Sequence, residues 1–432
     1  MTQPPVPLPR AVAEDAAPPG TKLLPGWLFV AMATFIGLNL RAALGSVPPL
    51  LPPITDELGL SSTTQGMLTS VAILFTGLCA PVGQKLGARI GPERATAVML
   101  GTLAVGCSIR LVADHTWVFL LSSAVAGVGM GGATALLPSL IAHHVPKIRG
   151  IAMGLYSTGL AMGVAVAAWI AVPTDAWLGG WKPALALWGL IALVTLALWL
   201  CATPRLRRAY PSREVTGLVV NHRLPWRSRT AWWVTWYTTA AMIIGFSGLA
   251  WVTPLYVELG VPDQRAAGYF VAFQVVQLAG MLTLPWLTDY TRDRRPLLAL
   301  VLVSSAVGIA CLLIDPLGLV WPAMCLFGTG AGGGSTLALV LLVDVASSQA
   351  DAARLSGMVM LVAYVAGAFA PVLLGVLHDL TGAYTAGYSV ILALILGVLV
   401  TIPAFRPDRR LENPALGHPA SVSPSQGQSA RR

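Results

Sequence analysis

Twelve long apolar segments constrain what this chain can fold into more than any other feature of its sequence. Each has close to the length that an α-helix needs to cross a bilayer, about 20 residues for about 30 Å of hydrocarbon. Charged residues make up only 10% of the chain, against about 25% in soluble domains. The sequence therefore predicts an all-α integral membrane protein with twelve transmembrane helices. The predicted spans are residues 27–51, 64–86, 95–113, 117–142, 150–172, 184–202, 232–256, 266–288, 297–314, 317–343, 356–377 and 387–405.

The lysines and arginines predict the orientation of these helices. Arg110, Lys182 and Arg265 fall on one side of the predicted membrane, Arg41 falls inside the first span, and all the others fall on the side of the two termini. By the positive-inside rule, both termini and the basic loop after the sixth span are expected in the cytoplasm. We therefore expect a multi-pass protein of the cell inner (cytoplasmic) membrane. The same placement accounts for the net charge of +9, so no nucleic-acid partner is expected.

Two short repeats divide the chain into halves. Glu57–Gly59 (ELG) after the first span returns as Glu258–Gly260 after the seventh, and Gly127–Gly132 (GVGMGG) in the fourth returns as Gly328–Gly333 (GTGAGG) in the tenth. Both repeats have an offset of 201 residues, which predicts two pseudo-symmetric six-helix bundles with a site between them. The predicted parts are a disordered cytoplasmic N-terminal tail (1–26), a first bundle (27–202), a basic cytoplasmic loop (203–230), a second bundle (231–405) and a disordered cytoplasmic C-terminal tail (406–432).

The glycine repeat and the cysteines show no pattern of enzymatic or metal chemistry. A glycine run that binds a nucleotide follows a strand in a βαβ unit, whereas these glycines lie inside apolar helices. They are therefore expected to let neighbouring helices pack closely. The five cysteines form no CxxC pair and no Cys/His cluster, so disulfides and metal sites are not expected. The sequence predicts no cofactor and no enzymatic activity.

Arg41 is the residue that the sequence most clearly marks as functional. An arginine near the middle of a span costs at least about 2.5 to 3.5 kcal/mol and normally faces a bundle interior or a water-filled cavity. It is the only basic residue predicted in the membrane core, and Gly37 and Gly45 on either side are expected to leave its guanidinium approachable. Arg41 could bind an anionic or strongly polar substrate, or could instead hold backbone carbonyls of neighbouring helices. The position 201 residues later is Met242, so the two halves are chemically unequal at this level.

Polar and aromatic residues on other spans are candidates for the same site. Gln274 and Gln277 lie three residues apart, on one face of the eighth helix, where lipid would leave their amides without hydrogen bonds. They are predicted either to contact the substrate or to join helices. Tyr156, Trp251 and Tyr364, on the fifth, seventh and eleventh helices, could wall a pocket and each offer one polar group, or could serve in packing or lipid contact.

The sequence places no acid or histidine as a central proton relay. All the acids are predicted in tails, loops or helix ends, with Asp344 closest to the membrane, and all six histidines are predicted outside the apolar cores. Uniport, or coupling through anion binding at Arg41, therefore fits at least as well as proton coupling. Asp344 is expected to act as a cap or latch rather than as a relay.

Two loops resemble a motif of the major facilitator superfamily of transporters. Leu86–Gly91 (LGARIG) and Leu287–Arg295 (LTDYTRDRR) are similar to its cytoplasmic loop, in which an aspartate and basic residues join neighbouring helices. The first copy has Ala88 where the second has Asp289, which weakens the first loop as a charge latch. The resemblance implies a conformational role for Arg89, Gly91, Asp289, Arg294 and Asp344.

Further motifs look like one branch of that superfamily, the branch that includes the cyanate and 2-nitroimidazole transporters. They are Asn39–Arg41 with Pro48–Pro52, Leu136–Ile141 and the stretch Arg354–Gly382. The resemblance covers about residues 27 to 405. It implies a transporter that works by alternating access around a midplane cavity, lined by the first, fourth, seventh and tenth helices with help from their neighbours.

The substrate that this resemblance implies is a small anion or a compact polar solute, such as cyanate or a nitroheterocycle. The expected partners are this small molecule and the lipid bilayer, and a monomer is expected. A drug or multidrug efflux transporter is the alternative, although Val164 follows Gly163 where drug/proton antiporters carry a proline. A non-transporting membrane sensor or scaffold fits less well, because neither the tails nor the central loop has an apolar pattern that could fold into a soluble domain.

Overall fold

The computed structural model describes residues 25–209, 224–288, 291, 293–346 and 349–404. Within these ranges the chain is helical without strands, and twelve segments are long and apolar enough to cross a membrane. The predicted all-α fold with twelve spans is confirmed. The helices are α1 (Gly26–Gly45), α2 (Leu51–Leu58), α3 (Ser62–Ile90), α4 (Pro92–Ile109), α5 (Thr116–His144), α6 (Arg149–Leu178), α7 (Trp181–Ala209), α8 (Arg229–Glu258), α9 (Asp263–Thr288), α10 (Arg295–Ile314), α11 (Val320–Val345), α12 (Gln349–Thr381) and α13 (Tyr384–Thr401).

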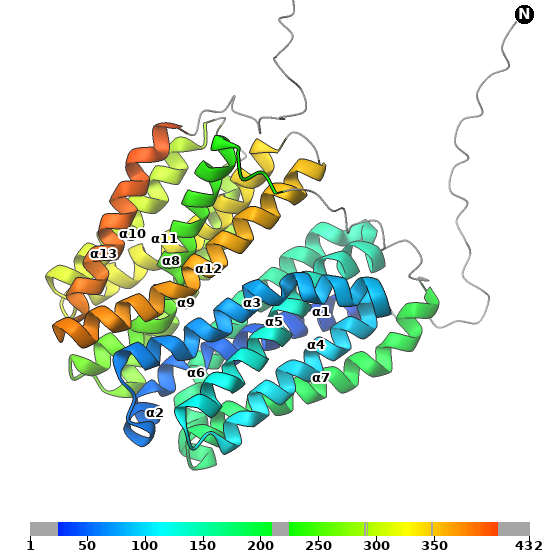
Figure 1. Cartoon of the computed structure of the whole chain (residues 1–432), viewed down its shortest axis with the longest axis horizontal. Coiled ribbons are helices and arrows are strands. Elements are labelled where there is room, and N and C mark those ends of the chain that lie inside the picture. Colours follow the sequence, from blue (N-terminus) through cyan, green and yellow to red (C-terminus); the bar gives the residue numbers. More distant parts are fainter. Residues whose placement is uncertain (1–24, 210–223, 289–290, 292, 347–348, 405–432) are drawn as a thin grey trace, which may run out of the picture.

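The connection between the sixth and seventh spans is partly helical. Helix α7 runs to Ala209, past the predicted end of its span at residue 202, and α8 begins at Arg229. Residues 210–223 of the predicted basic loop, and most of both predicted tails, lie outside the described residues. Below, α1–α7 are called the first half and α8–α13 the second half (Figure 1).

The first span is interrupted at Pro48 and Pro49, which have no backbone N–H with which to continue α1. A short 3-10 helix (Pro48–Leu50) and then α2 complete the span. The Ala43 carbonyl, in the last turn of α1, accepts a hydrogen bond of 3.1 Å from the guanidinium of Arg110. A buried side chain from the end of the third span therefore satisfies a carbonyl in the last turn of α1, because the N–H of Val47 bonds to the Leu44 carbonyl instead.

The repeated glycines pack helices together in both halves, as predicted. A Cβ added to Gly131 on α5 would lie 2.2 Å from the Thr76 carbonyl oxygen on α3. A Cβ added to Gly332 on α11 would lie 2.0 Å from the Gln277 carbonyl oxygen on α9. Only hydrogen fits at either contact, so glycine is required for the close approach of these helices.

The two halves meet where α3 begins and α12 ends, called the far end here because α1 begins at the opposite end (Figure 1). The Asp379 carboxylate accepts hydrogen bonds from the Ser62 N–H at 2.9 Å, the Thr63 N–H at 2.8 Å and the Thr63 hydroxyl at 2.6 Å. His378 Nδ1 lies 2.8 Å from Ser62 Oγ, and its Nε2 lies 2.9 Å from Glu258 Oε2. A carboxylate from one half thus caps the positive N-terminus of a helix in the other half. Away from the far end, α3 and α12 diverge.

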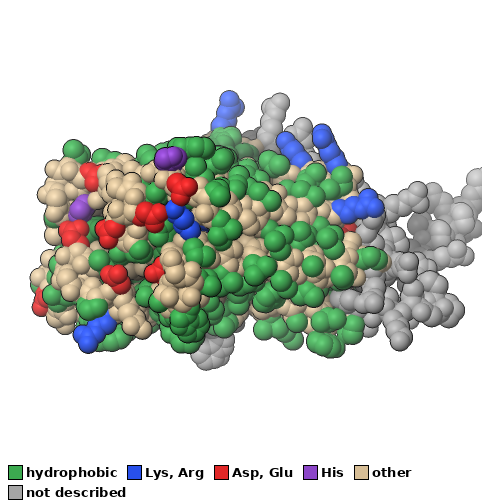
Figure 2. Space-filling view, turned by 90° about the horizontal axis from the view of Figure 1, so that it is seen from below, with side chains coloured by type: hydrophobic (Ala, Val, Ile, Leu, Met, Phe, Trp, Pro, Cys, Tyr) green, Lys and Arg blue, Asp and Glu red, His purple; other side chains and the backbone are tan. Residues whose placement is uncertain are grey.

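The surface has an apolar band between two differently charged ends. Figure 2 shows hydrophobic side chains over the middle of this face, acidic side chains towards the far end, and lysines and arginines towards the other end. At the far end, Lys182 Nζ lies 2.7 Å from Glu57 Oε1 and 2.6 Å from Asp114 Oδ1. The hydrogen bond from Lys182 holds the pKa of the Asp114 carboxyl below its usual value. Such an apolar belt is the surface that a bilayer would cover.

Candidate functional site

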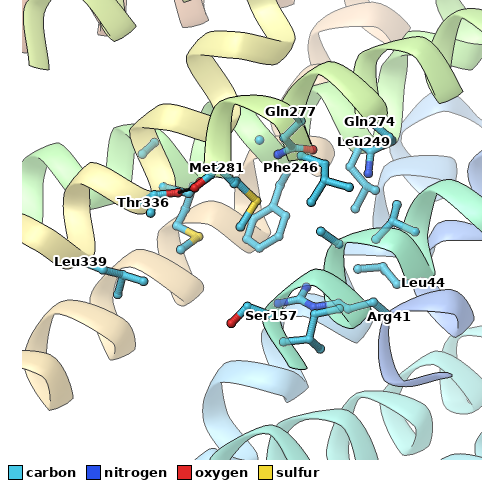
Figure 3. A pocket seen from close by; sticks show the side chains of 18 of the residues that line it. Arg41, Leu44, Ser157, Phe246, Leu249, Gln274, Gln277, Met281, Thr336 and Leu339 are labelled. Carbon is cyan, nitrogen blue, oxygen red and sulfur yellow. Dashed lines mark hydrogen bonds between the residues drawn. The ribbon is translucent and has the colours of Figure 1, made fainter. Parts of the chain in front are cut away.

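A cavity of about 370 Å³ lies between the two halves (Figure 3). Arg41 on α1 and residues of α6 form its first-half wall, and α8, α9, α11 and α12 form the second-half wall. Arg41 is the only charged side chain among the described residues that line it. The polar residues of the lining are Arg41, Ser157, Thr158, Gln274, Gln277, Ser335, Thr336 and Tyr364. The structure therefore brings together four of the six predicted substrate-binding residues, whose binding role stays a prediction.

Arg41 reaches across the cavity towards the second half. Its Nη2 donates a hydrogen bond of 3.3 Å to the Tyr364 hydroxyl on α12. The glycines beside it have a different role from the predicted one, because both face α6 rather than the cavity. A Cβ on Gly37 would lie 2.9 Å from the Tyr156 carbonyl oxygen, and one on Gly45 would lie 2.6 Å from the Val164 Cα. The glycines bring α1 against α6, and the cavity itself leaves the guanidinium accessible.

The second-half wall is mostly apolar. Phe246 on α8 packs against the Tyr364 ring, with the ring centroids 6.0 Å apart. Met242, the residue that matches Arg41 in the repeat, also lines the cavity. The side chains of Gln277, Phe246 and Met281 lie across the cavity from Arg41 in Figure 3. One cation in the first half thus faces an uncharged wall in the second.

Tyr156 lies beside the cavity but does not line it. Its side chain is only 2% exposed, and its ring packs into the space that Gly37 leaves open. Because the next residue of α6, Ser157, lines the cavity instead, Tyr156 packs α6 against α1 beside the cavity rather than lining it.

Trp251 is a packing residue in this structure rather than a wall of the pocket, which is the second of the two roles that the sequence left open for it. It is fully buried, and its indole N–H donates a hydrogen bond of 2.9 Å to the Pro371 carbonyl of α12. Its ring contacts Tyr384 at 5.4 Å between centroids. The polar group that would have served a substrate thus joins α8 to α12.

The fourth helix also differs from its expected role, because α5 contributes no residue to the described lining. Its place is taken by α6, the fifth span, which supplies Ser157, Thr158 and Ala161. The glycines of α5 pack its face against α3 and α4, as Gly127 does against Ala72 and Gly129 against Leu103. Helix α5 therefore lies one layer behind the cavity wall.

Arg110 overturns the prediction that Arg41 is the only buried cation. Its side chain is 1% exposed, and its guanidinium lies 5.5 Å from the centre of the Phe119 ring as well as on the Ala43 carbonyl. Its place at the end of an apolar run made it resemble a loop residue. The available signal was the proline pair Pro48–Pro49, which ends α1 and leaves the carbonyls of its last turn in need of other donors.

Glu93 and His144 are also buried, although all acids and histidines were predicted outside the apolar cores. Glu93 is 1% exposed and His144 is 7% exposed. His144 Nε2 lies 3.8 Å from Glu93 Oε1, and its ring stacks on Phe29 at 4.8 Å. These helix ends are covered because Trp199 of α7 packs over them and donates to the Glu93 carbonyl. The pair is not part of the cavity lining, so it supplies no relay at Arg41.

The predicted loop motif is formed mainly in the second half. Arg294 Nε donates to Asp344 Oδ2 at 3.0 Å, and its Nη1 donates to the Thr288 carbonyl. These contacts join the end of α11 to the connection between α9 and α10, as a latch would. In the first half, Gly91 has a φ of 91° between α3 and α4, which favours glycine, and Arg89 is exposed. Asp289 lies outside the described residues.

In the part of the chain that the structure describes, twelve helices could span a membrane and a cavity with a single charged lining residue lies between the two halves, which is the architecture of a membrane transporter. The chain belongs to the Major Facilitator Superfamily, whose family model matches residues 28–371. The resemblance inferred from the loop and proline motifs is therefore confirmed.

Relatives with the same architecture cover nearly the whole chain. It is 31% identical to the uncharacterized transporter YycB of Bacillus subtilis (strain 168), over 88% of this chain and 93% of the relative. It is 29% identical to the cyanate transport protein CynX of Escherichia coli (strain K12), over 87% of this chain and 96% of the relative. It is 28% identical to the 2-nitroimidazole transporter of the same organism, over 82% of this chain and 89% of the relative. A crystal structure of a bacterial homolog to the human lysosomal transporter Spinster shares the fold, with 16% identity, a TM-score of 0.71 and coverage of 88% and 96%.

Proposed function

We propose that this transporter moves a small anionic or compact polar solute across the cytoplasmic membrane, with Arg41 as the group that binds it. The observation that carries the proposal is the placement of Arg41, the only charged residue among the described residues of the cavity lining. An arginine exposed to a cavity within a membrane span attracts an anion strongly, because little water and no paired carboxylate compete for it. The Tyr364 hydroxyl, 3.3 Å from the guanidinium, is positioned to bind the same anion.

The relatives support this substrate class. One is named as a cyanate transport protein and another as a 2-nitroimidazole transporter. Cyanate is an anion, and a nitroimidazole is a compact polar ring, so a site with one cation and two amides suits both. Their identities of 29% and 28% support the class of solute rather than either compound.

The contacts between the halves support alternating access. In this structure Asp379 and His378 hold the far end together through Ser62 and Thr63. Access to Arg41 from the far end therefore requires these contacts to break, while the halves diverge at the other end (Figure 1). We place the termini, and hence the diverging end, in the cytoplasm by the positive-inside rule. Coupling through anion binding, or uniport, fits a cavity lining without an acid among the described residues.

A drug efflux transporter is the second candidate. The apolar lining, with Phe246, Leu249 and Met281, favours it over a wholly polar solute. Such a protein would use Arg41 weakly, because its substrates are mostly apolar or cationic. Dependence of transport on the guanidinium therefore separates the two candidates.

The test is uptake into proteoliposomes that contain the full chain. Labelled cyanate, a nitroheterocycle and neutral analogues are compared for wild type, Arg41→Lys, Arg41→Ala and the control Arg265→Ala, which removes an exposed arginine at the far end. We expect anion transport to fall by at least about tenfold in Arg41→Ala, from the loss of about 1.5 to 3 kcal/mol of charge-assisted hydrogen bonding. Arg265→Ala should transport like wild type. Anion transport that survives in Arg41→Ala, or energy-dependent dye efflux without anion preference, would refute the proposal.

A further inference from the structure

The size of the cavity indicates a larger substrate than a triatomic anion. The cavity measures about 370 Å³, and one water molecule takes about 30 Å³ of liquid, so the cavity has room for about twelve molecules of that size. Cyanate at Arg41 would leave most of this space to water. A six-membered ring with one or two substituents would displace most of this water. Excluding the water would strengthen the electrostatic contact between the substrate and Arg41.

The wall opposite Arg41 suits an aromatic ring. Phe246 lies across from Arg41 (Figure 3), and Met242, Met281 and Met360 line the same half of the cavity. Methionine sulfur is polarizable and makes favourable contacts with aromatic rings, while its flexible chain adapts to their shape. These apolar side chains would make no favourable contact with a small hydrated anion, but they would bury the face of an aromatic ring.

An unpaired amide marks a second polar position in the cavity. Gln274 is only 6% exposed, and its Oε1 has no hydrogen-bond partner among the described residues. Gln277 lies one turn further along α9, and both line the cavity. Figure 3 shows the two amides on the side away from Arg41. A buried acceptor without a donor costs free energy, so a substrate that supplies an O–H or N–H there binds more tightly.

From these three features we infer that the substrate is a ring-sized organic monoanion, an aromatic carboxylate that carries a hydrogen-bond donor on its ring. This inference deepens the proposed function and rests on it. The carboxylate binds Arg41 and Tyr364, the ring packs against Phe246 and the methionines, and the ring donor bonds to Gln274. One guanidinium balances one negative charge, so a dicarboxylate would place its second charge against the uncharged wall at a large desolvation cost.

Binding to the purified full-length protein tests this inference by isothermal titration calorimetry. The probes are 3- and 4-hydroxybenzoate, benzoate, isophthalate, acetate and cyanate. We expect benzoate to bind at least about tenfold more tightly than acetate or cyanate, and the better hydroxybenzoate about tenfold more tightly than benzoate, each tenfold step corresponding to about 1.4 kcal/mol. Isophthalate, which carries two charges, should bind more weakly than benzoate.

Two variants assign the contacts. Gln274→Leu should remove the preference for hydroxybenzoate, so that the variant binds benzoate and the hydroxybenzoates with equal affinity, because the ring donor loses its acceptor. The matched control is Gln264→Leu, on the same helix but exposed at the far end, which should keep the preference. Phe246→Ala should weaken benzoate about tenfold and leave acetate unchanged.

The outcomes separate this inference from the proposed function. If acetate and cyanate bind as tightly as benzoate and all three need Arg41, the anion site stands and the ring-sized substrate is overturned. If anion binding is the same in Arg41→Ala, the proposed function fails as well. Equal affinities of wild type for benzoate and both hydroxybenzoates, or no binding of either class at millimolar concentration, would also overturn the inference.

Discussion

The two halves of this transporter share a packing scaffold but differ in the chemistry that they present to each other. Gly131 packs on the Thr76 carbonyl in the first half and Gly332 packs on the Gln277 carbonyl in the second, at an offset of 201 residues in every case. Yet the buried Thr76 hydroxyl bonds to the Ala72 carbonyl of its own helix, whereas Gln277 lines the cavity. Equivalent backbones therefore carry different side chains at the site, so a repeat in sequence predicts helix packing better than it predicts function.

The end at which α1 begins shows a further difference between the halves. Glu93 pairs with His144 in the first half, and Arg294 pairs with Asp344 in the second. Glu93 and Arg294 occupy matching positions, 201 residues apart, and each lies just after a loop between two helices. The first-half pair is buried, whereas the side chains of the second-half pair are 27% and 40% exposed. Only one member of each pair matches in the repeat, because Asp344 corresponds to His143 rather than to His144, and one pair lies inside the protein while the other lies at its surface.

Glycine replacement should give the largest effect and tests whether the scaffold is equally tight in both halves. We expect Gly131→Ala and Gly332→Ala each to lower the free energy of unfolding by about 3 kcal/mol, because the added Cβ would overlap a carbonyl oxygen that cannot move alone. Thermal unfolding in detergent measures this loss. Gly154→Ala, where a Cβ meets nothing within 4 Å, is the control and should be neutral or slightly stabilising. If only one of the two variants lost stability, the two halves would not share an equally tight packing scaffold.

Moving the charge between the halves tests whether the inequality at the cavity is functional. Arg41→Met should weaken anion binding about thirtyfold, or about 2 kcal/mol, through loss of a charge-assisted hydrogen bond. Adding Met242→Arg should not restore binding, because Met242 and Phe246 both pack at Gly367, where α12 approaches α8 closely. Calorimetry with benzoate measures both variants. Recovery in the double variant would show that the position of the charge does not matter.

The two pairs should differ in their contribution to stability. We expect Glu93→Gln to lower the free energy of unfolding by about 1.5 kcal/mol, because it changes a buried polar group that lies 3.8 Å from His144. Asp344→Asn should cost less than about 1 kcal/mol, because exposed ion pairs contribute little. Chemical or thermal unfolding of the two variants in parallel gives the difference. Equal losses would mean that burial does not distinguish the two pairs.

Removing the contact at the far end should give the smallest effect. It tests whether the bonds of Asp379 to Ser62 and Thr63 have no counterpart at the matching positions of the repeat. Ser62 and Thr63, which bond to Asp379, correspond to Asp263 and Gln264 in the repeat, and Asp379 corresponds to Leu178. Asp379→Ala should therefore open the far end about fivefold more often, for a contact that contributes about 1 kcal/mol, while Asp263→Ala should not.

Distances between spin labels at Asp56 and Thr385, both exposed and on opposite halves at the far end, measure this opening in a background without cysteines. Thr63→Val, which removes only one of the three hydrogen bonds to Asp379, should give a smaller shift of the same sign. An unchanged distance distribution in Asp379→Ala would mean that packing alone, as at Gly66 and Gly375, holds this end together.

The membrane fold and the position of Arg41 followed from the sequence because both depend on local properties. Twenty apolar residues form a spanning helix wherever they occur, and a charge inside such a run must find a polar surrounding. The spacing of Gln274 and Gln277 likewise placed both amides on one helix face, and that face lines the cavity. The glycine repeat predicted close packing for the same reason, since a missing side chain is useful only where another helix approaches.

Only the tertiary structure decided which polar groups are left for a substrate. Trp251 looked like a pocket residue until its N–H was found on the Pro371 carbonyl, and Arg110 looked like a loop residue until α1 was found to end beside it. Burial of Glu93 and His144 depends on the helices that cover them, which no local pattern contains. The sequence by itself determined that a charge lies within a membrane span. The packing of six helices from two halves decided that this charge faces a cavity, because hydrogen bonds between distant segments occupy Trp251 and Arg110 and leave Arg41 opposite an uncharged wall.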